Sequence, residues 1–170
     1  MCIPVASSPA SRPITDIFAA MSLPEKRLIG RTDTIDLPEY GLSALGCKVD
    51  TGADTSSLHC SDIRVVETKD GLEVLEFHVL DPKHPQYSGQ RIRVASFRVR
   101  KVKSSFGTTE TRFSIDTKLL LFGLEWPVEF TLSDRENMRF PVLLGRRFLR
   151  KKFVVDVAKK NLSDKQRIKP

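Results

Sequence analysis

The feature that most constrains the fold is a repeated alternation of apolar and polar residues in short segments bounded by turn residues. The clearest segment has an apolar side chain at every second position, namely Trp126, Val128, Phe130 and Leu132. A period of two places these side chains on one face of a β-strand. Related segments predict strands at 27–37, 43–50, 72–79, 92–99, 113–121, 125–132, 140–144 and 153–157. Many short strands with turns between them indicate an all-β barrel or sandwich.

The domain organisation follows from composition along the 170 residues, a length that suits one domain. Residues 1–24 are rich in proline and serine, which predicts a flexible N-terminal arm. We expect the folded domain at 25–157 and a basic polar tail at 158–170. The segment from Arg146 to Pro170 carries ten Lys and Arg against two Asp. Contact with nucleic acid or an acidic partner is one interpretation, but a solvated surface is favoured because no aromatic residues are interleaved with the charges.

The location of the protein is predicted from what the sequence lacks. No apolar run has the length needed to span a bilayer, and the N-terminus does not resemble a secretory signal. We therefore expect a cytoplasmic protein with no membrane partner. Its cysteines, Cys2, Cys47 and Cys60, are too few to suggest a disulfide framework, so we expect free thiols.

Two motifs far apart in the chain carry the functional prediction. Asp50-Thr51-Gly52 follows an apolar strand and precedes Ala53 and Asp54. Alone, this tripeptide is weak evidence and favours an ordinary turn, in which the glycine adopts a positive φ. The second motif is the apolar segment Val142–Leu144, which ends in Gly145-Arg146.

Together these motifs resemble the retropepsin-like acid proteases, in which an apolar pair followed by glycine lies across the Asp-Thr-Gly loop. The match is more specific to a bacterial family of retropepsin-like aspartic peptidases often labelled "ATP-dependent zinc protease". That family shares Asp50-Thr51-Gly52-Ala53, the following Thr55-Ser56-Ser57-Leu58-His59, and the segment Met138–Arg146. The resemblance implies a retropepsin-like barrel with one or two short helices, in which residues 61–97 are an insertion.

The same resemblance implies roles for individual residues. Asp50 would be catalytic, with Thr51 and Gly52 shaping its turn. Substrate would lie against Ala53 and Asp54, under a flap hairpin that carries Phe106 and Gly107. Leu144, Gly145 and Arg146 would support the site, with Arg146 paired to Asp54.

The number of carboxylates bears on the oligomeric state. An acid protease uses two carboxylates that share one proton, so that one acts as base toward water and the other as acid. The chain holds one Asp-Thr-Gly, at Asp50. A complete pair therefore requires a second subunit, and we predict a homodimer that hydrolyses peptide or protein substrates.

The family label would also imply ATP and zinc. The sequence has neither a glycine-rich phosphate loop nor a His-Glu-x-x-His helix, so we expect no cofactor and no metal. The strongest zinc candidates are Cys47, His59 and Cys60, with His78 or His84 as a fourth ligand, but their spacing matches no standard zinc pattern. We expect His59-Cys60 in a helix or turn. The alternatives to an aspartic endopeptidase are a catalytically silent peptide-binding module and a zinc-dependent hydrolase.

Overall fold

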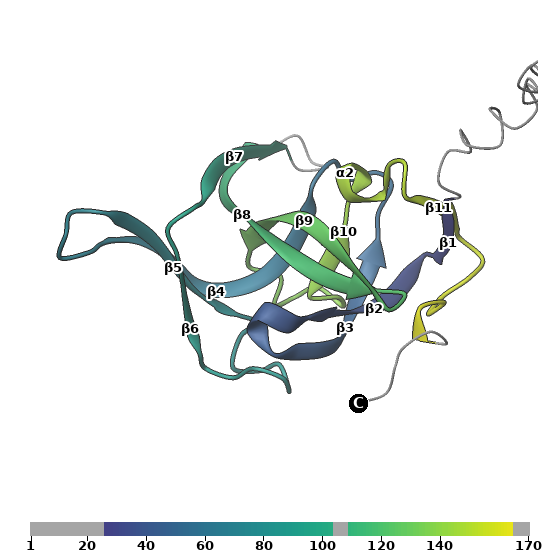
Figure 1. The fold of residues 1–170 in the computed structure, drawn as a ribbon, viewed down its shortest axis with the longest axis horizontal. Coiled ribbons are helices and arrows are strands. Elements are labelled where there is room, and N and C mark those ends of the chain that lie inside the picture. Colours follow the sequence, from purple (N-terminus) through teal and green to yellow (C-terminus); the bar gives the residue numbers. More distant parts are fainter. Residues whose placement is uncertain (1–25, 104–108, 165–170) are drawn as a thin grey trace, which may run out of the picture.

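The computed structural model describes residues 26–103 and 109–164 and shows a β-barrel with a long hairpin extending from one side (Figure 1). The strands are β1 (Arg27–Gly30), β2 (Thr32–Leu37), β3 (Leu42–Val49), β4 (Ser56–Glu67), β5 (Glu73–Val79), β6 (Arg91–Val94), β7 (Arg98–Lys103), β8 (Thr109–Leu121), β9 (Leu124–Ser133), β10 (Val142–Leu144) and β11 (Phe153–Asp156). The helical elements of this described part are a 3₁₀ turn, η2 (Pro38–Tyr40), and the short helix α2 (Arg146–Leu149). The predicted all-β fold with one or two short helices is confirmed. Within the same residues, no helix is both long and apolar enough to cross a membrane.

The barrel closes through β10. This strand pairs with β3 in parallel and with β4 in antiparallel orientation, so the ring runs β10-β3-β2-β8-β9-β4 and returns to β10. A closed ring leaves no exposed edge among its members. Its interior is filled by alternate side chains of these strands, as the sequence pattern predicts. The largest fully buried members include Leu45 of β3, Leu58 of β4, Leu119 of β8 and Phe130 of β9.

The segment predicted as one strand at 27–37 forms two strands. β1 pairs with β11 in a separate two-stranded sheet, whereas β2 enters the barrel beside β3. The chain bends at Arg31 between them. Gly30 permits this path, because a Cβ at this position would lie 2.5 Å from the backbone oxygen of Lys159. Periodicity does not reveal such a change of sheet, because β1 is only four residues long and runs directly into the alternating β2.

β4 corrects the expectation of a helix or turn at His59-Cys60. It is a strand of 12 residues whose first half lies between β9 and β10, and Leu58 and Cys60 face the core. The sequence pattern is obscured because Ser56, Ser57 and His59 are also buried, each with a hydrogen-bonding partner. Polar groups that are hydrogen-bonded in this way can be buried with little loss of folding free energy.

The segment 61–97, expected as an insertion, forms the outer half of β4 together with β5 and β6. Figure 1 shows β4 and β5 continuing beyond the barrel as the protruding hairpin. Glu76 of β5 is only 2% exposed and accepts hydrogen bonds from Arg64, Arg91 and Arg93. These side chains tie the strands of the extension to one another.

The end of the described chain is docked, although the sequence places a polar tail from residue 158. Backbone hydrogen bonds join Arg31 N–H to Lys159 and Asn161 N–H to Thr32, at 2.9 and 2.8 Å. The buried carboxylate of Asp33 then accepts hydrogen bonds from the backbone N–H groups of Leu162 and Ser163 and from the Ser163 hydroxyl. Residues 159–163 therefore cover the outer side of β2 and belong to the folded domain.

Candidate active site

The Asp50 loop connects β3 to β4 and is fixed through one oxygen of its carboxylate. Asp50 Oδ1 accepts the backbone N–H groups of Gly52 at 3.0 Å and Ala53 at 3.3 Å. Its own N–H donates to the carbonyl oxygen of Leu144 at 3.0 Å. Within the described residues no hydrogen bond is found to Oδ2, so this oxygen remains available to a water or a second carboxyl group. The side chain is half-buried.

The junction of β10 and α2 supports this loop through hydrogen bonds from its main chain. The N–H of Gly145 donates to the Ser56 hydroxyl at 3.1 Å, and the N–H of Arg146 donates to the carbonyl of Ala53 at 2.9 Å. A Cβ on Gly145 would lie 2.4 Å from the carbonyl oxygen of Thr55, so only glycine fits here without movement of the chain. Leu144, which is fully buried, anchors the junction in the core.

Arg146 holds the carbonyl side of the Asp50 turn. One guanidinium nitrogen, Nη1, donates to the carbonyl oxygens of Gly52 at 2.7 Å and Thr51 at 3.2 Å. The expected pairing of Arg146 with Asp54 is present at 3.7 Å, but Arg147 lies closer to Asp54, at 2.9 Å. Both arginines and Asp54 are about half exposed, so these ion pairs add little to stability by themselves. The main contribution of Arg146 is therefore to brace the turn.

The flap was expected around residues 104–107, and the strands on either side of this segment, β7 and β8, form a hairpin. The strands are antiparallel, and their register runs from Arg98 opposite Ser114 to Lys103 opposite Thr109. Phe106 and Gly107, the expected substrate contacts, lie outside the described residues. At its base the hairpin is anchored by Glu129 of β9, which accepts hydrogen bonds from Arg100 and Ser114. Burial alone would raise the pKa of Glu129, but these two hydrogen bonds lower it on balance.

A polar wall on the non-core face of the barrel was not predicted from sequence. The hydroxyls of Ser57 and Ser133 lie 2.8 Å apart and are buried. Leu143 stands opposite Ser57 and is half-buried, whereas its neighbours Val142 and Leu144 face the core. Arg135 follows this wall after the end of β9. A single sequence does not predict this polar group, because strand pairing is what places its serine residues next to each other.

His59 links three segments beside this wall. Its Nδ1 accepts the backbone N–H of Arg135 at 2.8 Å, and its Nε2 contacts the carboxylate of Asp81 at 2.5 Å. With Nδ1 an acceptor, the proton of the neutral ring lies on Nε2 and is donated to Asp81. The pKa of Asp81 is lowered first by this hydrogen bond and then by one from the backbone of Lys83.

The residues considered for zinc do not fit a zinc ion. Both ring nitrogens of His59 are engaged, and burial raises the pKa of the Cys47 and Cys60 thiols well above the usual range, which disfavours the thiolate that binds metal. Across residues 26–103 and 109–164, no group of three or more His, Cys, Asp or Glu is arranged to hold a metal ion. We therefore derive no step through zinc.

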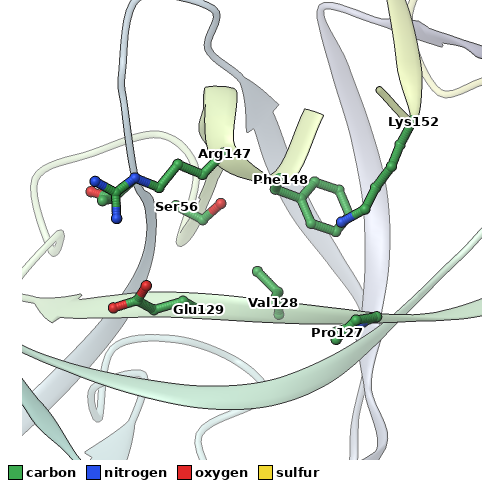
Figure 2. A pocket seen from close by; sticks show the side chains of 8 residues that line it. Ser56, Pro127, Val128, Glu129, Arg147, Phe148 and Lys152 are labelled. Atoms are coloured by element: carbon green, nitrogen blue, oxygen red, sulfur yellow. The ribbon is translucent and has the colours of Figure 1, made fainter. Parts of the chain in front are cut away.

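A small pocket of about 160 Å³ lies between β9 and α2, behind the Asp50 loop (Figure 2). Val128 and Phe148 contribute its apolar lining, Ser56 also lines it, and Lys152 extends over the Phe148 ring with Nζ 4.6 Å from the ring centre. The pocket belongs to the support of the site, because Ser56 also holds Gly145.

Comparisons with known proteins agree with this geometry. A family model described as "RimB-like: Retropepsin-like aspartic endopeptidase RimB" matches residues 28–166. A protein named "Probable alpha-L-glutamate ligase" from Desulfotalea psychrophila is 38% identical over 137 residues, which is 78% of this chain and 28% of that protein. A protein of the same name from Parasynechococcus marenigrum is 34% identical over 135 residues, again 28% of its length.

The chain therefore spans little more than a quarter of the length of the ligase-named relatives it matches. Among solved structures, a protein of unknown function from Legionella pneumophila superposes with a TM-score of 0.59, at 24% identity. That match covers 82% of this chain and 99% of the Legionella protein. At this level of identity the likeness concerns the fold alone.

Proposed function

The chain belongs to the RimB-like family of retropepsin-like aspartic endopeptidases, and from this membership we propose that it hydrolyses peptide bonds with Asp50 as its catalytic residue. The observation that carries the proposal is the state of the Asp50 carboxylate. Oδ1 is held by two backbone N–H groups, whereas no described residue donates to Oδ2. Oδ1 is thus fixed in position, and Oδ2 is free to take part in proton transfer.

The proposed reaction uses two such carboxylates that share one proton. The ionised group accepts a proton from water, whose oxygen attacks the carbonyl carbon, while the protonated group donates to the carbonyl oxygen. The resulting tetrahedral diol then collapses: the carboxyl group that took the proton from water donates it to the amide nitrogen, the other carboxylate accepts the proton of a diol hydroxyl, and the C–N bond breaks to release an acid and an amine. Aspartic proteases are the general example of carboxyl groups held too close for both to ionise.

A homodimer would supply the second Asp50. The proposal is supported by the β1–β11 sheet, where Leu28 and Val154 are paired neighbours with 40% and 51% of their surfaces exposed. Val157, just after β11, is 71% exposed. Apolar side chains gathered on a short two-stranded sheet favour burial against a second copy of the same surface.

The names of the relatives suggest the substrate class. They are called probable α-L-glutamate ligases, and the part they share with this chain is only a minor fraction of their length. We propose that the substrate is a peptide or protein segment carrying glutamate residues joined through α-peptide bonds. Cys47 and Cys60 are free thiols, which supports action in the reducing cytoplasm.

The test compares the wild type with Asp50→Asn on α-linked oligoglutamate peptides and on a mixed peptide library. Asn preserves the shape but cannot exchange the proton, so kcat/KM should fall about 100- to 10,000-fold. Asp70→Asn, an exposed carboxylate in the β4–β5 turn, is the matched control and should retain activity. Full activity of Asp50→Asn would overturn the proposal, and loss of activity in chelator would favour the zinc hydrolase. Peptide binding without cleavage by the wild type would favour the silent module.

A further inference from the structure

A second cavity of the molecule lies away from the Asp50 loop. It has a volume of about 380 Å³ and lies between the turn at 81–85, which follows β5, and the segment 135–141, which leads into β10. None of its lining residues belongs to the Asp50 loop. β10 separates the two places, because Pro141, just before its start, lines the cavity, whereas Leu144 at its end accepts the N–H of Asp50.

Both walls of this cavity are held by hydrogen bonds. In the first wall, the backbone N–H of Lys83 donates to the Asp81 carboxylate at 2.6 Å. In the second wall, the N–H of Met138 donates to the carbonyl oxygen of Arg135 at 2.7 Å. An ion pair between Lys83 and Glu136 joins the two walls. The cavity is therefore preformed, which lowers the entropic cost of binding a ligand in it.

Arg135 offers two unused donors at this cavity. The side chain is half-buried, and its Nε donates to the carbonyl oxygen of Phe140 at 3.2 Å, which restricts the orientation of the guanidinium. Within residues 26–103 and 109–164, Nη1 and Nη2 have no hydrogen-bonding partner, and no carboxylate lies within ion-pair distance of them. Every buried side-chain nitrogen or oxygen of these residues has a partner, so both Nη atoms are open to solvent. Two neighbouring N–H donors of this kind bind a carboxylate in a bidentate manner.

His84 adds a third donor from the opposite wall. Its Nδ1 accepts the backbone N–H of Gln86 at 3.2 Å, so the proton of the neutral ring lies on Nε2. Burial lowers the pKa of His84, which keeps the ring neutral near pH 7. In the part of the chain that the structure describes, Nε2 has no acceptor, and it is likewise open to solvent. A single ligand in the cavity can therefore meet donors from both walls.

The two acidic side chains that line this cavity already have partners. Asp81 accepts hydrogen bonds from the His59 ring and from the turn that follows it, and Glu136 is paired with the Lys83 ammonium group. The charge of Arg135 is therefore not balanced by either of them. A half-buried cation without an acidic partner favours the binding of an external anion.

We propose that this cavity is a binding site for an organic carboxylate, which is held in a bidentate manner by Arg135 and by a further hydrogen bond from His84. Pro85, Met138 and Pro141 also line the cavity, and their apolar surface suits the carbon chain attached to such a group. The same chemistry is offered by an acidic side chain of a protein and by a free small acid. The site is separate from the Asp50 loop, so the inference goes beyond the proposed peptidase function and does not depend on it.

The experiment follows the backbone amide signals of the isotope-labelled full chain by NMR during titration. The probes are N-acetyl-glutamate amide, its neutral analogue N-acetyl-glutamine amide, glutarate and inorganic phosphate. A carboxylate probe should shift the signals of His84 and Met138 and leave that of Gly52 in place, and the neutral analogue should bind at least about 10-fold more weakly. Binding of either carboxylate probe supports the inference, and the tighter of the two identifies the source of the group. The inference is overturned if neither carboxylate shifts these signals, or if phosphate binds as tightly as both.

Variants of the two donor residues assign the contacts. Arg135→Gln should weaken carboxylate binding about 10- to 100-fold, as expected for one charge-assisted pair, and His84→Ala about 2- to 10-fold. Arg135→Lys should recover part of the affinity, because it keeps the charge and loses the bidentate geometry. A thermal melt checks the folding of each variant, and if Arg135→Gln does not fold, Arg135→Lys and His84→Ala decide the outcome. Unchanged affinity in the folded variants contradicts the proposed site.

Two further arginine and lysine variants control for general positive charge. Lys69→Gln removes the same charge from the exposed β4–β5 turn and should bind the carboxylate probes like the wild type. Arg139 lines the cavity but is exposed, so Arg139→Gln should weaken binding less than Arg135→Gln does. If Lys69→Gln weakens binding equally, or if the order of the two arginines is reversed, the inference is overturned.

One more variant separates this inference from the proposed function. Asp50→Asn should bind N-acetyl-glutamate amide with wild-type affinity, because no residue of the Asp50 loop lines the cavity. Loss of binding in Asp50→Asn would place the carboxylate at the catalytic loop and would overturn the inference. A wild type that binds the carboxylate at His84 and Met138 but cleaves no peptide contradicts the proposed function and supports the separate site.

Discussion

His59 shows how one buried residue can join three segments of the chain. It is 3% exposed and lies between Asp81, which accepts the proton of Nε2, and the backbone N–H of Arg135, which donates to Nδ1. The contact at Nδ1 requires the neutral ring, whereas the one at Nε2 does not. His59 therefore ties β4 to the loop after β5 and to the segment that follows β9.

Acid should weaken this link through Asp81. The pKa of Asp81 is lowered in the folded protein, mainly by the hydrogen bond from His59. A carboxylate of this kind stabilises the fold fully above its ordinary pKa of about 4, and the contribution is lost as the pH falls through the folded-state value. The unfolding free energy of the wild type should thus fall more steeply below about pH 5 than that of Asp81→Asn. Urea denaturation over a pH series measures both slopes, with Asp70→Asn as control, and identical slopes for the wild type and Asp81→Asn would contradict this account.

The sequence allows prediction of those site residues that lie within a continuous motif. Asp50, Gly52, Gly145 and Arg146 are recognisable because each belongs to a short continuous motif that the resembled family shares. The buried hydroxyl pair of Ser57 and Ser133 joins residues that are 76 positions apart. A contact formed across strands leaves no trace in spacing, so this pair could be found only from the structure.

At the scale of elements, the β10–α2 junction fixes the geometry of the Asp50 loop. The strand is only three residues long, yet it pairs with both β3 and β4 and ends at a glycine packed against the backbone of Thr55. The next two N–H groups, of Arg146 and Arg147, donate to the carbonyls of Ala53 and Asp54. The loop is thus held by main-chain contacts that depend on close approach at Gly145.

Gly145→Ala should disrupt this junction. A Cβ placed 2.4 Å from the Thr55 carbonyl oxygen forces the loop and α2 apart, at a cost of about 1–3 kcal/mol or more in unfolding free energy. Because the displaced loop carries Asp50, activity should be lost at temperatures where the variant is still folded. Gly41→Ala is the control: its φ of 64° makes it strained at about 1–2 kcal/mol, but no atom lies within 4 Å of its Cβ, so activity should persist. Thermal melts and peptide cleavage report the two effects separately, and an active Gly145→Ala would contradict the role of the junction.

Elements were predictable where one face is apolar and the other polar. β9 meets this condition most clearly and was predicted within one residue of its observed bounds, while β8 extends four residues before its predicted start. β4 does not meet the condition, because five consecutive residues from Ser56 to Cys60 are buried and three of them are polar. The docked segment 159–163 is mostly polar as well, and it is held by hydrogen bonds to Asp33, with Leu162 as its apolar contact with the core. The sequence did not predict β4 or the docked segment for the same reason: hydrogen-bonded polar groups can be buried without an apolar pattern.

At the scale of the whole molecule, closure of the barrel is what brings the two motifs together. Asp50 and Leu144 are far apart in the chain, and they meet because β10 inserts between β3 and β4. The order of the motifs indicated this arrangement through the family resemblance, whereas periodicity alone left barrel and sandwich open. The separate β1–β11 sheet was also hidden from sequence, and it is this sheet that presents Leu28 and Val154 outward.

If each active site needs Asp50 from two subunits, a dimer of one wild-type and one Asp50→Asn subunit should be inactive. Wild type mixed with an equal amount of Asp50→Asn, after exchange of subunits, should form roughly one quarter wild-type homodimers, so that activity per wild-type subunit falls to about half. Excess Asp50→Asn should reduce the activity per wild-type subunit further.

The control is the double variant Asp50→Asn with Val154→Lys. It carries a charge at the exposed, apolar face of β11 and should no longer associate with wild-type subunits. It should therefore leave wild-type activity unchanged while remaining folded, because Val154 contributes nothing to the buried core. Sedimentation of each mixture measures the fraction of dimer, which is compared with the peptide-cleavage activity of the same mixture. Activity that is independent of added Asp50→Asn, at concentrations where exchange is demonstrated, would show that one chain suffices and would remove the dimer from the mechanism.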